Sequence, residues 1–264
     1  MAYALDPAAV AAGYSLEVHD SLGSTSTLAM ERARAGLPAP LWVVTRRQTA
    51  GRGRRGSTWT SPEGNLAASL AWPVPAGLTP ERVATLGFVA GVSLEQALRR
   101  ACGPSPDPAA EFRLKWPNDV LAGGAKLAGI LLEYEAGPAG AAVVIGFGVN
   151  VAAAPEGLPY PATALATLGR PADAPGLFRL LSGTWMAASG LWDEGRGFPA
   201  IRAAWLAAAA GLGGPVMVEA GDTRLTGTFE TIDAGGRLVL RLGDGTHRTV
   251  SAGAVHVGRA AAAI

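Results

Sequence analysis

The sequence is poor in the residue types that build disulfides, metal clusters and ion-pair networks. Its single cysteine, Cys102, excludes an internal disulfide, and its three histidines, His19, His247 and His256, have no zinc-site spacing. Charged residues make up only 16% of the chain, against roughly 25% in an average globular protein. With a formal net charge of +1, a surface that coats nucleic acid is not expected.

Long hydrophobic runs are also missing. The longest apolar stretches, near 139–154 and 203–212, are short or interrupted by glycine and asparagine, whereas a helix that crosses a bilayer needs ~20 apolar residues. The segment 1–13 has no basic residue before its apolar stretch and carries Asp6, so it does not resemble a secretory signal. We therefore expect a soluble cytoplasmic protein.

Lysine is scarce too. Only Lys115 and Lys126 occur, eleven positions apart, and the other twenty of the 22 lysines and arginines are arginine. Lysine offers a compact point charge on a flexible stem, whereas arginine offers a planar fork. The segment 115–126 is therefore a candidate site for a bound anion, and the alternative is that an arginine-biased composition left two lysines by chance.

Apolar periodicities predict a mixed α/β domain. The expected strands are 14–19, 41–44, 65–72, 112–116, 127–134 and 141–149, and the expected helices are 28–35, 80–100, 162–169, 174–192 and 198–210. The stretch 46–57 has no periodicity and is expected to be a loop. After 211–215, short alternating segments at 216–219, 224–230, 238–241 and 247–250 predict a small β-barrel.

The expected loop is suited to meet an anion. Residues 46–56 contain five arginines, three glycines and no acidic residue. Glycine lets the backbone approach a ligand, and Arg52 and Arg54 can each fork onto carboxylate or phosphate oxygens. Taken alone, the loop fits a nucleic-acid arm or a solvated basic loop equally well. Trp59 lies just beyond it, where its ring could stack on a purine or anchor the core.

The lysine segment contains further candidate ligands. Asn118 could bind a phosphate or a hydrated cation, and Asp119 could assist Mg²⁺, although a plain Asn-Asp turn is an equal alternative. Lys126 opens an apolar strand, so its ammonium should have an anionic companion: a ligand, or a carboxylate such as Glu133 or Asp119. The strand that ends at Asn150 carries glycines that allow close approach of a ligand, or that only mark packing.

Together and in this order, these pieces strongly resemble the biotin protein ligase family, also called biotin–[acetyl-CoA-carboxylase] ligases. The resemblance rests on Ser24-Thr25-Ser26, the segment 48–56, Trp59, the segments 115–119 and 126–130, and Gly146-Phe147-Gly148-Val149-Asn150. It implies a mixed α/β catalytic domain over residues 1–212, similar to the class II aminoacyl-tRNA synthetase core. An SH3-like domain over residues 213–264 would follow.

The resemblance also implies a reaction in two steps. Biotin and ATP, with Mg²⁺, give biotinyl-5′-AMP and pyrophosphate, and a lysine of a biotin carboxyl carrier domain then takes the biotin and releases AMP. The partner would be a biotin-dependent carboxylase, with no membrane involved. Homodimer formation through an exposed sheet edge stays open.

Site residues follow from the same resemblance. Catalysis would rest on Lys126, Arg52 and Arg54. Biotin would bind to Ser24, Thr25, Ser26, Gln48, Gly51, Arg52, Gly53, Arg54, Lys126 and Gly129. ATP and the adenylate would bind to Arg54, Arg55, Trp59, Asn118, Lys126 and Asn150, with Asp119 as a ligand of Mg²⁺.

The sequence departs from the family pattern in two ways. Ser26 stands where many relatives have asparagine. No winged-helix segment precedes the catalytic part, so we expect neither DNA binding nor repression. A lipoate or octanoate ligase is the nearest rival, and a nucleic-acid-binding module is the rival from another class.

Overall fold

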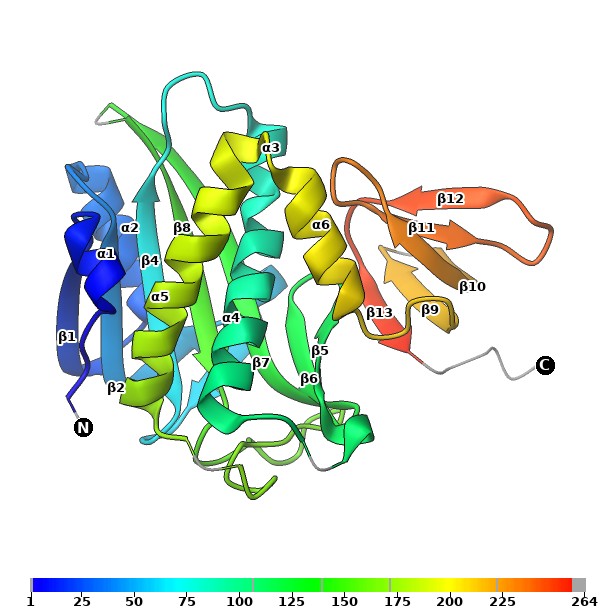
Figure 1. Ribbon diagram of the computed structural model, residues 1–264, viewed down its shortest axis with the longest axis horizontal. Coiled ribbons are helices and arrows are strands. Elements are labelled where there is room, and N and C mark those ends of the chain that lie inside the picture. The colour runs from blue at the N-terminus through cyan, green and yellow to red at the C-terminus, as the bar shows by residue number, and fades with distance from the viewer. Residues whose placement is uncertain (1, 106, 139, 171, 222, 258–264) are drawn as a thin grey trace.

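The computed structural model, which describes residues 2–105, 107–138, 140–170, 172–221 and 223–257, contains a large mixed sheet and a smaller antiparallel sheet beside it (Figure 1). The strand order in the large sheet is β1-β2-β4-β8-β7-β6-β5, with β3 paired to β2. The bounds are β1 (Ser15–Leu22), β2 (Leu41–Arg52), β3 (Thr58–Ser61), β4 (Leu66–Pro73), β5 (Phe112–Lys115), β6 (Asp119–Ala122), β7 (Ala125–Gly137) and β8 (Gly140–Val149). Strand β1 runs parallel to β2, and the other pairings are antiparallel.

Strand β2 shows why both faces of the sheet are covered. Trp42 and Val44 point into the main core with helices α4 (Leu86–Cys102), α5 (Ala174–Trp192) and α6 (Phe198–Ala207), which lie in front of the sheet in Figure 1. Leu41 and Val43 point the other way, toward α2 (Thr25–Ala35). Side chains alternate between the two faces of a strand, so a continuous apolar run fills both cores.

The helices begin where capping residues place them. Asp173 caps α5 by accepting a hydrogen bond from the backbone N–H of Gly176, with a proline in the first turn. Thr79 caps α3 (Pro80–Ala84) in the same way. The expected helix 80–100 is divided at Thr85, whose Oγ1 donates to the carbonyl of Arg82 and accepts from Trp192 Nε1. A short helix α1 (Pro7–Ala11), not expected from the sequence, follows Asp6.

Two expectations for the large domain were wrong. The expected loop 46–57 is largely ordered, because β2 continues to Arg52, the 3₁₀ turn η1 (Arg54–Gly56) follows, and β3 pairs back on β2. The expected helix 162–169 forms turns, because its backbone instead bonds to Lys126 and Asn150. Strand β6 follows a turn at 116–118 and was not expected; it pairs with both β5 and β7.

The smaller sheet has the order β12-β11-β10-β9-β13. Its strands are β9 (Pro215–Ala220), β10 (Thr223–Ile232), β11 (Leu238–Arg241), β12 (His247–Val250) and β13 (Ala254–Val257), of which β13 was not expected. The expected short strands are confirmed, and they pair in antiparallel fashion. The pairings among the described residues leave β12 and β13 at the edges rather than closing a barrel.

The smaller sheet is attached to the large domain through buried contacts. Trp116 Nε1 donates a hydrogen bond of 3.0 Å to the carbonyl of Gly236, in the turn between β10 and β11. Phe88 of α4 packs against the same glycine, and the rings of Trp205 and Phe229 meet edge to face. In the part of the chain that the structure describes, no helix has the length and apolar character to cross a membrane.

Candidate active site

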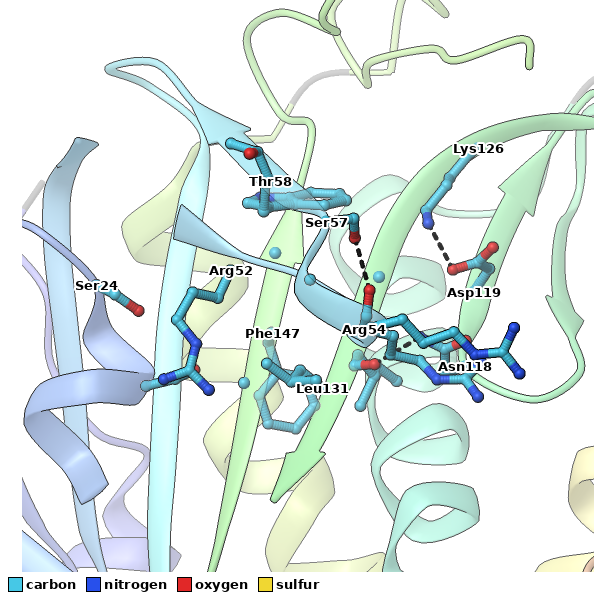
Figure 2. Close-up of a pocket in the computed structure, with 18 of the residues that line it drawn as sticks. Ser24, Arg52, Arg54, Ser57, Thr58, Asn118, Asp119, Lys126, Leu131 and Phe147 are labelled. Carbon is cyan, nitrogen blue, oxygen red and sulfur yellow. Dashed lines mark hydrogen bonds and ion pairs between the residues drawn. The ribbon is translucent and has the colours of Figure 1, made fainter. Parts of the chain in front are cut away.

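A cavity of about 230 Å³ lies on the face of the large sheet that also carries α2. Its lining residues come from distant segments of the chain (Figure 2), namely Ser24, Thr25, Ser26, Gln48, Arg52, Gly53, Arg54, Arg55, Ser57, Thr58, Trp59, Ala68, Asn118, Asp119, Lys126, Gly129, Ile130, Leu131, Gly146, Phe147, Gly148, Tyr160, Gly253 and Ala254. Every residue that the sequence assigned to a site, except Gly51 and Asn150, lines this cavity.

One end of the cavity is a cluster of hydroxyl and amide groups at the start of α2. Ser24 caps the helix, and the backbone N–H of Thr25 donates to Gln48 Oε1 at 2.9 Å. The hydroxyls of Thr25 and Ser26 meet the hydroxyl of Ser69 at 2.8 and 3.0 Å. Ser69, on β4, is fully buried and was not assigned to the site. A serine within an apolar strand was the only sequence signal for it.

Glycines form the floor of the cavity, where they permit close approach of other side chains. A Cβ atom at Gly148 would lie 2.3 Å from Trp59 Cε2, and one at Gly146 would lie 2.7 Å from Ser26 Oγ. Gly129 of β7 pairs with Gly148, and Trp59 lies over it as well. The strand-end glycines thus make room for Trp59, whose ring forms a wall of the cavity.

The other end carries Lys126 and Asp119, with Lys115 behind the carboxylate. Lys126 Nζ lies 2.7 Å from Asp119 Oδ1, and Lys115 Nζ lies 3.5 Å from Asp119 Oδ2. Figure 2 shows Lys126 and Asp119 facing each other at the cavity. The lysine ammonium also lies 5.7 Å from the ring centre of Trp59 and 5.4 Å from that of Tyr160. The expectation that Lys126 has an anionic companion is confirmed, and among the alternatives the companion is Asp119.

The two arginines assigned to catalysis have protein partners in this structure. Arg52 forms a short ion pair with Glu133 of β7. Arg54 Nη1 donates to Asn118 Oδ1 at 3.0 Å, and Asn118 Nδ2 donates to the carbonyl of Ile130 at 2.7 Å. Burial, and next the charge of Arg55, lowers the pKa of the Arg54 guanidinium from its ordinary value. Arg54 remains a cation and is fixed at the cavity wall.

Two assigned residues lie outside the cavity. Gly51 is buried in β2, where a Cβ atom would lie 2.2 Å from the carbonyl oxygen of Trp59, so it permits the close pairing of β2 and β3. Asn150 is also buried, and its Nδ2 donates to the carbonyl of Thr163 at 3.1 Å. It lines a neighbouring cavity of about 30 Å³ together with Lys126 and Tyr160.

Several lining residues were not assigned from the sequence. Leu131 and Phe147 supply an apolar middle, and Tyr160 comes from the segment after β8. Gly253 and Ala254 come from the smaller sheet, so both domains contribute to the cavity. Only tertiary packing brings these positions together, and the local pattern of each is that of an ordinary core or turn residue.

The arrangement does not form a resident metal site. Within the described residues, no group of three or more histidines, cysteines, aspartates or glutamates lies close enough to hold an ion. Each carboxylate oxygen of Asp119 faces a lysine ammonium, so a metal there would compete with an ammonium. The assignment of Asp119 to Mg²⁺ therefore stays a prediction.

Comparisons with known proteins match both domains. Residues 18–150 match the biotin/lipoate A/B protein ligase family, and residues 211–258 match the biotin protein ligase C terminal domain. A biotin–[acetyl-CoA-carboxylase] ligase of Paracoccus denitrificans is 42% identical over 83% of this chain and 90% of its own length. One from Mycobacterium tuberculosis is 35% identical over 91% of this chain and 88% of its own.

The fold has a match among solved structures. The biotin protein ligase from Aquifex aeolicus in complex with biotin and ATP superimposes with a TM-score of 0.77. The match covers 92% of this chain and 99% of the Aquifex chain at 22% identity. It shows that the two proteins share a fold.

Proposed function

The chain belongs to the biotin/lipoate A/B protein ligase family, and we propose that it is an ATP-dependent biotin protein ligase. The observation that carries the proposal is the division of the cavity into a hydroxyl end, an apolar middle and a cationic end. Biotin has the matching order of groups: a ureido ring that donates and accepts hydrogen bonds, an aliphatic chain and a carboxylate.

In the proposed binding mode, the ureido ring lies among the hydroxyls of Ser24, Thr25 and Ser26 and the amide of Gln48. The aliphatic chain lies along Leu131 and Trp59. Its carboxylate then points toward the end of the cavity that holds Lys126 and Arg54. Gly53 and Gly129 leave room for the chain between these groups.

The first step joins this carboxylate to ATP. A carboxylate oxygen attacks the α-phosphorus, the bond from that phosphorus to the β-phosphate oxygen breaks, and pyrophosphate leaves with Mg²⁺. Because both reactants are anions, catalysis depends on positioning and on offsetting charge, the role we assign to Lys126, Arg54 and Arg52. We assign the nucleotide to Arg55, Trp59, Asn118 and Asn150.

The second step transfers biotin to protein. The amino group of an acceptor lysine attacks the acyl carbon of biotinyl-5′-AMP, the bond to the phosphate oxygen breaks, and AMP leaves while the amine loses a proton. The acceptor we propose is the biotin carboxyl carrier domain of a carboxylase, since the relatives from Paracoccus and Mycobacterium are named for acetyl-CoA carboxylase. A mixed anhydride hydrolyses in water, so a closed arginine segment over the cavity would preserve it.

We further propose that residues 1–212 form the ligase domain and residues 213–264 the second domain. The match of 211–258 to the biotin protein ligase C terminal domain supports this division and favours biotin over lipoate. Gly253 and Ala254 line the cavity, so the second domain would complete the site rather than merely accompany it.

The test is incubation with biotin, MgATP and a biotin carboxyl carrier domain, read by mass spectrometry of the carrier. We expect a mass increase of one biotin on one lysine. Pyrophosphate exchange measured in parallel with biotin and with lipoate separates the two ligase types. Exchange with lipoate alone would overturn the proposal.

A further inference from the structure

Lys115 reaches the candidate site only through another residue. Its Nζ lies 3.5 Å from Asp119 Oδ2, while Lys126 holds the opposite oxygen, Oδ1, at 2.7 Å. Among the described residues that line the cavity, Lys126 and Asp119 are present and Lys115 is not. All three side chains are largely buried, at 25%, 13% and 19% exposed for Lys115, Asp119 and Lys126 respectively. The carboxylate is thus shared by one ammonium inside the cavity and one behind it.

The backbone fixes this arrangement. Lys115 and Asp119 are directly opposite each other in the β5–β6 pairing, and Asp119 is opposite Gly129 of β7. Both the carboxylate and the rear ammonium therefore come from paired strands. Lys126 sits near the start of β7, and its ammonium lies within 6 Å of the ring centres of both Trp59 and Tyr160, at 5.7 and 5.4 Å. Of the two ammonium groups, only that of Lys126 lies at the cavity.

The charges of the cluster decide what an anion in the cavity meets. Two ammonium groups and one carboxylate give a net charge of +1, whereas Lys126 and Asp119 alone would give zero. Arg52 adds nothing to this sum, because Glu133 neutralises it. Of the other arginines that line the cavity, Arg54 is paired with the neutral amide of Asn118 and Arg55 is exposed. Within the buried cluster, Lys115 therefore offsets the charge of Asp119, which would otherwise cancel that of Lys126.

Lys126 can turn fully toward a ligand only by weakening its contact with Asp119. A buried carboxylate that loses its only counter-charge is strongly unfavourable, and this cost would hold Lys126 in place. With Lys115 on Oδ2, the carboxylate keeps a partner when Lys126 turns toward the cavity. We propose that Lys115 is a positioning residue, which acts through Asp119 to release Lys126 to the anionic group of the substrate.

This inference rests on the proposed function, because the anion in question is the carboxylate of biotin. Two other roles would also give Lys115 an effect. It could contact a ligand directly, or it could only hold β5 to β6. These roles differ in whether Asp119 is needed: only the role proposed here disappears when the carboxylate is neutral.

The experiment is a double-mutant cycle on biotin affinity, measured by calorimetry without nucleotide and in EDTA, so that no metal takes part. The variants of the full-length protein are Lys115→Met, Lys115→Arg, Asp119→Asn and the double variant Lys115→Met/Asp119→Asn. Arg113→Met is the matched control, since it removes one exposed cation from the same strand. Thermal unfolding of each variant reports any structural damage.

We expect Lys115→Met to weaken biotin binding roughly tenfold, the size expected of one unit charge several ångströms away in a partly buried site. Lys115→Arg should restore most of the affinity, and Arg113→Met should leave it unchanged. In the Asp119→Asn background, Lys115→Met should have a clearly smaller effect, because only the long-range attraction of one ammonium is then lost.

An equal loss from Lys115→Met in both backgrounds would overturn the proposal and indicate a direct contact or a structural role. Unchanged affinity in Lys115→Met would overturn it as well. Absence of biotin binding by the unmodified protein would instead overturn the proposed function, so the two failures are distinguishable.

Discussion

Arg52 and Glu133 form an ion pair that crosses two strands of the sheet. Arg52 ends β2, Glu133 lies on β7, and β4 and β8 separate these strands in the sheet order. Glu133 follows Leu131 on the same face of β7, just beyond the lining of the cavity. The pair thus ties the arginine segment to the far side of the cavity, and Arg54 bonded to Asn118 makes a second attachment.

Glu133→Gln should therefore loosen the arginine segment. Partly exposed ion pairs contribute about 0.2–1 kcal/mol, so the segment should open up to about fivefold more often. Trypsin cleaves after arginine, and its rate of cleavage between residues 52 and 56 measures this opening. Glu135→Gln is the matched control. Glu135 lies on the same strand as Glu133, and its substitution breaks an ion pair with Arg34 of α2, away from the cavity. Equal cleavage rates in the two variants would contradict the tie.

Lys126 combines three features in one small ammonium group. The group contacts Asp119, lies 5.7 and 5.4 Å from the ring centres of Trp59 and Tyr160, and faces the cavity. Lys126→Ala should lower the single-turnover rate of adenylate formation about 10²–10³-fold, the usual loss for one preorganised donor. Lys126→Arg should also be slow, since a planar fork replaces a point charge. Near-normal turnover of the arginine variant would count against this role.

The glycines at the floor of the cavity give a steric prediction. In Gly148→Ala the new Cβ would lie 2.3 Å from Trp59 Cε2, so the indole must move. Overpacking of this kind costs about 1–3 kcal/mol, and the displaced ring would enter the space proposed for biotin. We expect a marked rise in KM for biotin and changed tryptophan fluorescence. Gly137→Ala, at a β7 position with no atom within 4 Å of the new Cβ, should be silent in both measurements.

Local pattern predicted those parts of the fold that depend on local chemistry. The apolar run in β2 and the apolar spacing of α5 gave strand and helix correctly, because both patterns are visible in a short window. The segment 162–169 failed for the opposite reason. Its apolar spacing suits a short helix, but its backbone is held by bonds to Lys126 and Asn150, which are distant in sequence.

The contacts of the candidate site also divide into those that local sequence predicts and those that depend on tertiary packing. The companion of Lys126 could be anticipated because a buried ammonium requires an anion, and the sequence offered few carboxylates nearby. The partner of Arg52, Glu133, could not be anticipated, because the contact depends on β7 lying three places from β2 in the sheet. Ala254 could not be predicted either. An alanine in the smaller sheet has no chemical feature that indicates a cavity, and it lines one only because the two sheets are docked.

Ser69 is the buried centre of the hydroxyl cluster. Its hydroxyl meets those of Thr25 and Ser26, so Ser69→Ala leaves both without this partner. A hydrogen bond of this kind contributes about 0.5–1.5 kcal/mol, so biotin affinity should fall about two- to tenfold while kcat changes little. Ser93→Ala removes a fully buried serine of α4 that bonds to Val89 and serves as the control. A similar loss of affinity in both variants would indicate a general packing effect.

The docking of the second domain can be tested at Gly236. Its φ is +80°, a region that favours glycine, and a Cβ there would lie 2.4 Å from Phe88 Cε2. Gly236→Ala combines backbone strain with a collision at the interface, and the nearby bond from Trp116 Nε1 to the Gly236 carbonyl would be strained too. Gly245 has a φ of +83° and open space around the new Cβ, so Gly245→Ala imposes the strain alone.

Both variants should lose about 1 kcal/mol of unfolding free energy from the backbone, and Gly236→Ala about 1–3 kcal/mol more from overpacking. The sharper readout is activity. Gly253 and Ala254 line the cavity only while the smaller sheet stays docked, so Gly236→Ala should slow adenylate formation and Gly245→Ala should not. Normal adenylate formation in a destabilised Gly236→Ala protein would show that the second domain contributes stability but no part of the working site.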